Sequence, residues 1–246
     1  MCMIQSWIES NLDAYTIRAR LRPALIVVLP VALVVLIFFP NDLTTLGLIV
    51  SVIVACGGTS LLSQIGRNRG KSKENFLYAQ WEGGKPTTRI LRHSTSTNSI
   101  ILEQRHNKLK ELFPSLKIPN ISEEATLPEE ADQVYDACIK LLIGKTRDKD
   151  KFPLVFEENC NYGFCRNLWG MKPLGITTSI IGLLVSMGLI ATNFYILKST
   201  IPSFAIICSL LSFLLLFLWI FLFTPSWVKV AADAYAERLL ESCEIL

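Results

Sequence analysis

Four long apolar stretches dominate the pattern of hydrophobic and polar positions along the chain. They are Pro23–Phe39, Leu43–Leu62, Leu174–Leu197 and Ile201–Phe223, and none of them contains a charged residue. An α-helix rises about 1.5 Å per residue, so stretches of this length can cross the apolar layer of a bilayer. The pattern predicts an all-α membrane protein with four transmembrane helices and an α-helical cytoplasmic domain inserted between the second helix and the third.

The segments around these stretches indicate a domain organisation. In residues 4–20, and again after Pro225, apolar residues recur at three- and four-residue spacing, which is typical of amphipathic helices at a membrane surface or on a neighbouring domain. The predicted parts are an N-terminal interfacial helix (1–22), a first transmembrane hairpin (23–62), a cytoplasmic sensor or interaction domain (63–173), a second transmembrane hairpin (174–224) and a C-terminal cytoplasmic helix (225–246).

Positive charges predict the orientation in the membrane. Arg18, Arg20 and Arg22 precede the first apolar stretch, and the segment 63–173 has more Lys and Arg than Asp and Glu. The turn after the first stretch has no basic residue, and the turn after the third has only Lys198. We therefore expect both termini and the central domain on the cytoplasmic side.

Helix signals in the central segment predict a mostly α-helical domain. Thr97 or Asn98 can cap a first helix, and Pro128 suits the first turn of a second helix that Gly144 ends. A third helix is predicted for Pro153–Trp169.

Two basic loops are candidates for binding an anion. The loop Trp81–His93 contains Gly83 and Gly84, which permit tight turns, and the loop Lys145–Phe152 closes a predicted helix with several bases. Bases at a helix C-terminus are also favourable for the helix dipole alone, so the second loop has a purely structural explanation. The phosphate-binding pattern GxxxxGK[ST] is absent from the first loop. The residues predicted to contact an anion are Lys85, Arg89, Arg92, Lys145, Arg147 and Arg166.

The sequence gives less support to a catalytic site or a metal site. His93, His106, Cys160 and Cys165 are possible metal ligands, but their spacing matches no common zinc module. None of the seven cysteines lies in a predicted outer turn, so we expect free thiols. The apolar stretches hold no ionisable group for proton transfer. We expect no metal, no cofactor and no enzymatic activity.

Small residues recur every fourth position in two of the apolar stretches. Such faces allow helices to approach closely, and their hydroxyls also suit the wall of a water-filled path. Tight packing inside one bundle and a pore between subunits both remain possible explanations. The residues predicted to line a pore are Gly47, Ser51, Ala55 and Thr59 in the second stretch and Thr178, Gly182 and Ser186 in the third.

The segment ENCNYGFCRNLWGMKPLG, which leads into the third stretch, is rich in aromatic residues. Aromatic rings settle at membrane interfaces, so Tyr162, Phe164 and Trp169 are predicted to couple the cytoplasmic domain to the membrane helices.

Three segments resemble motifs of a family of bacterial membrane proteins with four transmembrane helices. They are WEGGKPTTRILRH, TRDKDKFPLVFEEN and NYGFCRNLWGMKPLGI, and the likeness covers most of Trp81–Ile176. Where the family pattern has a second basic residue, this chain has Cys165, which leaves Arg166 as the one cation of that pair. The family motifs imply no reaction.

The layout is also similar to that of small membrane effectors in bacterial anti-phage systems, such as the channel of the Hailong system. This resemblance implies an ion-conducting homo-oligomer in the bacterial inner membrane, controlled by a nucleotide or oligonucleotide signal from a partner nucleotidyltransferase.

Our leading hypothesis is therefore an oligomeric channel or pore-forming effector gated by a phosphate-bearing signal. A membrane scaffold that recruits a cytoplasmic partner protein through residues 63–173 is the alternative. A third hypothesis is a membrane enzyme that uses Cys165 or His93.

Overall fold

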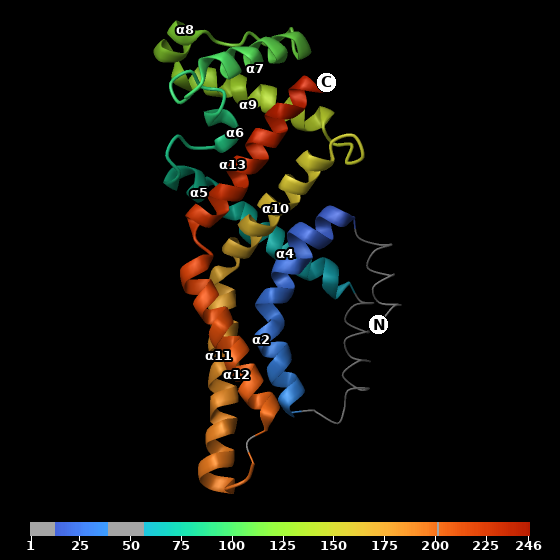
Figure 1. The fold of residues 1–246 in the computed structure, drawn as a ribbon, viewed down its shortest axis with the longest axis vertical. Helices are drawn as coiled ribbons and strands as arrows, with labels where there is room; N and C mark the ends of the chain where they lie inside the picture. Colours follow the sequence, from blue (N-terminus) through green and yellow to red (C-terminus); the bar gives the residue numbers. More distant parts are fainter. Residues whose placement is uncertain (1–12, 39–56, 201) are drawn as a thin grey trace. The chain divides into compact units, whose positions relative to one another are not determined.

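The computed structural model describes residues 13–38, 57–200 and 202–246, and every element in this part of the chain is helical (Figure 1). The all-α prediction is confirmed for these residues. The chain divides into two compact units. Unit 1 comprises Met1–Glu74 and Gly163–Trp227, and unit 2 comprises Asn75–Tyr162 and Val228–Leu246.

Unit 1 contains the apolar helices. A π-helical turn, Thr16–Leu21, continues into α2 (Arg22–Phe38), and α4 spans Gly58–Ser72. The unit also includes the last part of α10 (Pro153–Gly170). Two long helices follow. They are α11 (Lys172–Ala191), extended by a π-helical segment to Leu197, and α12 (Ser203–Phe217), extended in the same way to Leu222.

Two helices in the described part of the chain are long and apolar enough to cross a membrane, Lys172–Leu197 and Ser203–Leu222. In each, only 22% of the most apolar window is buried inside the protein, whereas the core helix of a soluble protein is mostly buried. Leu184 and Leu210, for example, are each 65% exposed. Two apolar helices could thus cross a membrane, which agrees in part with the predicted fold.

The other two predicted membrane helices are described only partly. Helix α2 corresponds to the predicted stretch Pro23–Phe39 and is 17 residues long. Most of the predicted stretch Leu43–Leu62 lies outside the described residues. Its end differs from the prediction, because Gly57 adopts a left-handed conformation (φ 83°) and the chain after it belongs to α4, which continues to Ser72.

Small residues let α11 pack closely against α12 and α2. A side-chain carbon at Gly175 would lie 2.1 Å from the ring of the buried Trp219, and one at Gly182 would lie 2.6 Å from the Ser212 hydroxyl oxygen. These glycines are therefore required where they stand, because any larger side chain would force the helices apart.

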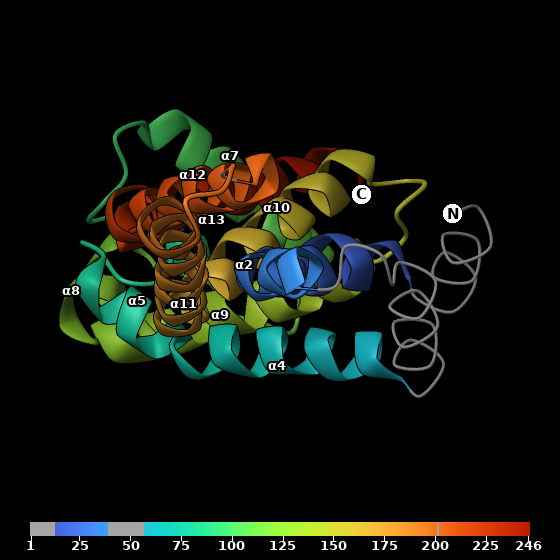
Figure 2. The ribbon, with the colours of Figure 1, turned by 90° about the horizontal axis from the view of Figure 1, so that it is seen from below.

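Helix α4 runs across the other helices of unit 1. Figure 2 shows α2 and α11 end-on while α4 lies across the view. The side of α4 that faces the unit consists of small residues, which are Thr59, Ser63, Gly66 and Gly70, and all four are buried.

Unit 2 is built around α9 (Pro128–Lys145), with α5 (Glu74–Gln80), α6 (Pro86–Arg89), α7 (Ser99–Leu112), α8 (Ile121–Thr126), the first part of α10 and α13 (Pro225–Glu241). The three helices predicted in the central segment are confirmed as α7, α9 and α10, but Gly144 does not end the second one, since α9 continues to Lys145. Asn98 caps α7 by accepting hydrogen bonds from the backbone N–H groups of Ile100 and Ile101.

The core of unit 2 joins α9 to α7 and α13. Tyr135, Ile139 and Leu142 of α9 are fully buried and belong to one cluster with Leu109 and Leu239. Full burial of an aliphatic side chain of this size contributes about 1.5–3 kcal/mol, so this cluster supplies a stable frame for the site described below.

Candidate functional site: a pocket beside His93

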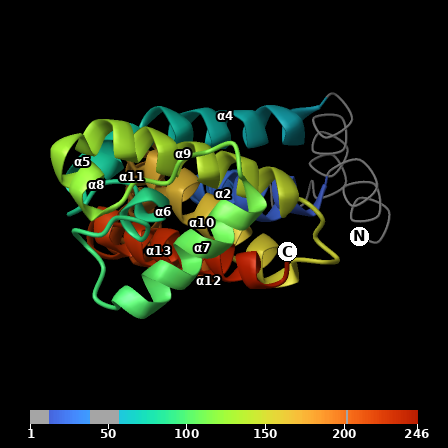
Figure 3. The same ribbon diagram turned by 90° about the horizontal axis from the view of Figure 1, so that it is seen from above.

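The first basic loop of the sequence is held by ion pairs within unit 2. Lys85 lies 2.8 Å from an Asp136 oxygen, and Arg89 lies 3.0 Å from Asp233. Arg92 donates two hydrogen bonds to Asp132, one of them 2.7 Å long. Since Asp132 and Asp136 belong to α9 and Asp233 to α13, the pairs fix α6 between these helices, as Figures 1 and 3 show.

These carboxylates set the electrostatics of the loop. The hydrogen bond to Asp132 raises the pKa of Arg92 despite partial burial. Burial works to raise the pKa of Asp136, but its contacts with Lys85 and Thr88 outweigh burial and lower that pKa. Lys85, Arg89 and Arg92 are therefore neutralised by partners from the same unit, and an anion would have to compete with those partners.

The other three residues predicted to contact an anion lie elsewhere. Lys145 ends α9 with its amino group 6.0 Å from the centre of the Phe113 ring. Arg147 is exposed in the loop that follows. Arg166 belongs to unit 1 and lies 2.8 Å from Glu74. The five predicted residues that belong to unit 2 do not converge on one site.

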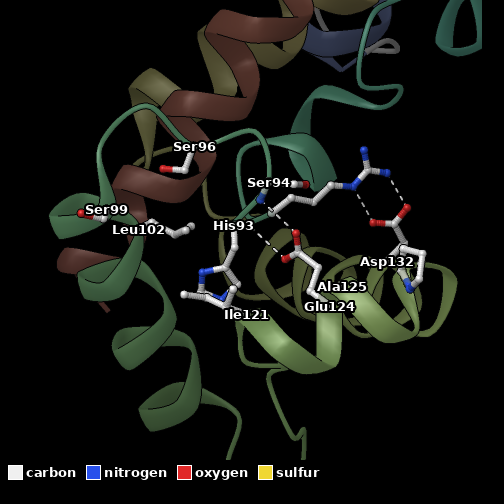
Figure 4. A pocket seen from close by; sticks show the side chains of 11 residues that line it. His93, Ser94, Ser96, Ser99, Leu102, Ile121, Glu124, Ala125 and Asp132 are labelled. Carbon is white, nitrogen blue, oxygen red and sulfur yellow. Dashed lines mark hydrogen bonds and ion pairs between the residues drawn. The ribbon is translucent and has the colours of Figure 1, made fainter.

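One pocket of unit 2 lies between the loop after α6, the start of α7 and α8 (Figure 4). Its volume is about 560 Å³. An adjoining pocket of about 480 Å³ shares four of its residues, namely His93, Ser99, Leu102 and Ile121, and adds Asn107 and Lys110. The lining of the first pocket comprises Arg92, His93, Ser94, Ser96, Ser99, Leu102, Ile121, Glu124, Ala125, Pro128 and Asp132.

Glu124 organises the wall of this pocket. Its buried carboxylate accepts hydrogen bonds from the backbone N–H groups of His93 (2.8 Å) and Ser94 (3.0 Å) and from the Tyr135 hydroxyl (2.8 Å). Burial works to raise the pKa of Glu124, but these hydrogen bonds outweigh burial and hold the pKa below its usual value. The carboxylate is therefore charged near neutral pH and fixes the turn that carries His93.

His93 is also in contact with the second histidine of the chain. The rings of His93 and His106 lie 4.8 Å apart, edge to face, and the His106 ring stacks on Tyr135 at 5.7 Å. His106 is buried, and its Nε2 lies 2.8 Å from the Leu91 carbonyl oxygen, to which it donates. Burial lowers the pKa of His106, so this ring is neutral near pH 7. It forms an uncharged part of the wall of the adjoining pocket.

The two adjoining pockets suit different chemical groups. Leu102, Ile121 and the His93 ring offer apolar and aromatic surface to a flat group such as a nucleobase. Beside them, Lys110 and Asn107 offer hydrogen-bond donors to an anionic group. The sequence pattern does not indicate Ser99, Asn107, Lys110 and Ile121, because only the fold brings α7 and α8 to the same histidine. His93 itself was considered as an anion contact, a metal ligand or a catalytic residue.

Among the described residues, neither a metal site nor a reactive thiol is found. These contain no group of three or more His, Cys, Asp or Glu residues placed to hold a metal ion. The described cysteines are Cys138, Cys160, Cys165, Cys208 and Cys243, and all are buried. Burial raises the pKa of both Cys138 and Cys243 to about 11, so their thiols stay protonated.

The segment that leads into the third apolar stretch forms a packing junction in unit 1. The buried Asn167 donates a 2.7 Å hydrogen bond to the carbonyl oxygen of Ala19, in the π-helical turn. A side-chain carbon at Gly170 would lie 2.7 Å from the Gly70 backbone, so α10 crosses α4 without room for a side chain. The Arg166–Glu74 pair lies beside this crossing.

The aromatic residues predicted to act in coupling occupy both units. In unit 2, Tyr162 stacks on Tyr235 with the rings 6.1 Å apart. In unit 1, Phe164 packs on the apolar cluster of Leu168 and neighbouring residues, and the Lys73 amino group lies 5.2 Å from the Trp169 ring. The division between the units falls inside α10, after Tyr162.

The residues predicted to line a pore are only partly described, since Gly47, Ser51 and Ala55 lie outside the described residues. Thr59 is buried on the inner side of α4. In α11, the Thr178 hydroxyl donates to the Val27 carbonyl oxygen (2.7 Å), Gly182 faces Ser212, and the Ser186 hydroxyl donates to the Gly182 carbonyl oxygen (2.8 Å). These three residues therefore lie on the packed side of α11.

Comparison with known protein families, with curated proteins and with solved structures finds no match to this chain.

Proposed function

We propose that this protein is an oligomeric membrane channel or pore-forming effector, gated by a phosphate-bearing signal that binds to unit 2. The signal is a nucleotide or oligonucleotide from a partner enzyme, and the setting is anti-phage defence at the bacterial inner membrane. The observation that carries the membrane part is the exposed apolar surface of α11 and α12, where Leu184 and Leu210 are examples. In water such a surface would drive aggregation, whereas a bilayer covers it.

In this proposal the chain spans the membrane four times with both termini in the cytoplasm. The charge pattern supports it, because Arg22 opens α2 and Lys172 opens α11, each just before an apolar run. Ser179 and Ser212 also support a polar seam, since both hydroxyls are buried and have no hydrogen-bond partner among the described residues. Assembly of several chains would complete the conducting path.

The paired pockets beside His93 support the proposed ligand. A volume near 560 Å³ lies within the range of small-molecule sites, about 300–1,000 Å³. A base would stack on His93 against Leu102 and Ile121, and a phosphate would meet Lys110 in the adjoining pocket. The ion-paired Lys85, Arg89 and Arg92 would then keep the loop in shape, and would contact the phosphate only after a rearrangement.

Binding of labelled nucleotides and short oligonucleotides to the purified full chain tests this proposal. We expect His93→Ala to weaken binding about 5- to 150-fold, because loss of base stacking costs about 1–3 kcal/mol. Gln104→Ala, a change at an exposed position of α7 that lines neither pocket, is the matched control and should bind as the unmodified chain does. Equal binding by all three chains, or no binding by any, would contradict the proposed ligand site.

The alternative is a membrane scaffold that recruits a cytoplasmic protein. Exposed apolar side chains near the pocket favour it, since Ile100 is 76% and Ile121 is 67% exposed. A scaffold predicts a protein that co-purifies stably, loses its binding in Ile100→Ser, and leaves liposomes impermeable to ions.

A further inference from the structure

Helix α4 presents a distinct outer face. Its inner face of small residues packs on unit 1, whereas Leu61 is 63% exposed and Ile65 is also exposed. Two and four residues after Ile65, Arg67 and Arg69 are exposed as well, at the two edges of this outer face. The helix thus shows apolar groups in its first half and basic groups in its second half, and no acidic residue occurs between Gly58 and Ser72.

The position of α4 along the apolar helices follows from Gly66. A side-chain carbon there would lie 3.1 Å from the Arg20 carbonyl oxygen and 3.4 Å from the Met171 side chain. Arg20 comes just before α2 and Met171 just before α11, so α4 crosses unit 1 at the level where both apolar helices begin. It lies across them (Figure 2), and a helix in this position would run along the surface of a membrane that α2 and α11 cross.

Within the described part of the chain, no acidic side chain neutralises the two arginines on this face. Lys71 and Arg166 both pair with Glu74, but Arg67 and Arg69 form no ion pair with any described residue. Two uncompensated arginines at the membrane level would attract negative groups, and each base near a bilayer surface contributes about 1 kcal/mol of attraction to anionic lipid.

We propose that α4 is an interfacial helix that binds anionic phospholipid headgroups through Arg67 and Arg69, with Leu61 and Ile65 inserted among the acyl chains. The proposal rests on the membrane placement in the proposed function, and it adds a lipid partner that neither the pore nor the signal requires. The guanidinium groups would hold the phosphodiester of the headgroup by charge-assisted hydrogen bonds. Bound anionic lipid would in this way hold α4 at the membrane surface, at the height where α2 and α11 begin.

The test measures lipid selectivity of the full chain. Protein immobilised in uncharged detergent is given equimolar fluorescent phosphatidylglycerol and phosphatidylcholine, and the ratio retained is measured. We expect the unmodified chain to enrich phosphatidylglycerol and the Arg67→Gln/Arg69→Gln variant to lose about 30-fold of that preference, the equivalent of about 1 kcal/mol for each base removed. Raised salt should weaken the preference.

Lys149→Gln/Lys151→Gln is the matched control, because it removes the same charge from the exposed loop after α9. It should keep the preference of the unmodified chain. An unchanged preference in the arginine variant overturns the proposal. So does complete competition by millimolar inorganic phosphate, which would identify a free-phosphate site instead.

A carbonate wash of membranes separates this proposal from the membrane placement itself. If the chain stays in the membrane but the arginine variant keeps its lipid preference, only the role of α4 is wrong. If the wash releases the chain, the membrane placement fails and the lipid site fails with it.

Discussion

The hydrogen bond between Tyr135 and Glu124 offers a quantitative test of the pocket wall. Both groups are buried, and the hydroxyl lies 2.8 Å from the carboxylate. Tyr135→Phe removes only the hydroxyl and leaves the ring stacked on His106. A hydrogen bond to a charged group contributes about 1.5–3 kcal/mol to stability, so the variant should be less stable by about 2 kcal/mol.

In a protein of this size, 1 kcal/mol corresponds to about 2–4 °C in Tm. Thermal unfolding of the detergent-solubilised full chain should therefore show a Tm about 4–8 °C lower for Tyr135→Phe. Tyr195→Phe is the matched control, because Tyr195 is 74% exposed, and its Tm should not change. Equal melting of Tyr135→Phe and the unmodified chain would refute the assigned role of this hydrogen bond.

The pH dependence of this difference has a definite sign. Because folding lowers the pKa of Glu124, the carboxylate contributes stability above its unfolded pKa, and that stability is lost as the pH falls through the folded pKa. The Tm difference between the unmodified chain and Tyr135→Phe should therefore be full at neutral pH and shrink at acid pH, once Glu124 is protonated. A difference that grows on acidification would contradict this account.

Three further changes, with Gly144→Ala in unit 2 as a comparison, test the junction in unit 1 and its link to activity. Gly170→Ala places a carbon against the Gly70 backbone and should cost about 1–3 kcal/mol, whereas Gly144→Ala meets open space in a helix and should stabilise by up to about 1 kcal/mol; thermal unfolding measures both. Glu74→Gln removes the carboxylate that pairs with the nearly buried guanidinium of Arg166. The variant should lose about 3 kcal/mol of stability, and the Tm of the solubilised chain should fall. Trp169→Ala should leave nucleotide binding intact but abolish the response of ion flux to the nucleotide; loss of binding as well would show a structural role only.

Regular patterns in the sequence predicted the helices of unit 2 well. The cap at Asn98, the proline that opens α9 and the apolar spacing within α9 are local signals, and each was confirmed. The same holds for the two apolar helices α11 and α12, whose length and composition alone identify them. The start of α4 was not predicted, because its signal is the backbone conformation of Gly57 inside an apolar run.

Partners distant in the sequence could not be predicted. Basic residues in a loop look like an anion site until the fold places a carboxylate beside each one, as it does for Lys85 with Asp136 and Arg89 with Asp233. Arg166 was assigned to a ligand for the same reason, although its carboxylate partner is 92 residues away. The pocket beside His93 forms only because α7 and α8 lie side by side in the fold. No spacing of residues along the chain indicates that α7 and α8 are neighbours.

In the proposed function, a nucleotide signal gates an ion-conducting assembly of this chain. Ion flux from liposomes that contain the purified full chain, measured with and without candidate nucleotides and oligonucleotides, is the test of this gating. We predict that at least one of these ligands switches the ion flux on or off. We also predict that the His93→Ala variant conducts ions without responding to the ligand. Liposomes that stay impermeable under every condition, or that conduct with no response to any ligand, would contradict the claim.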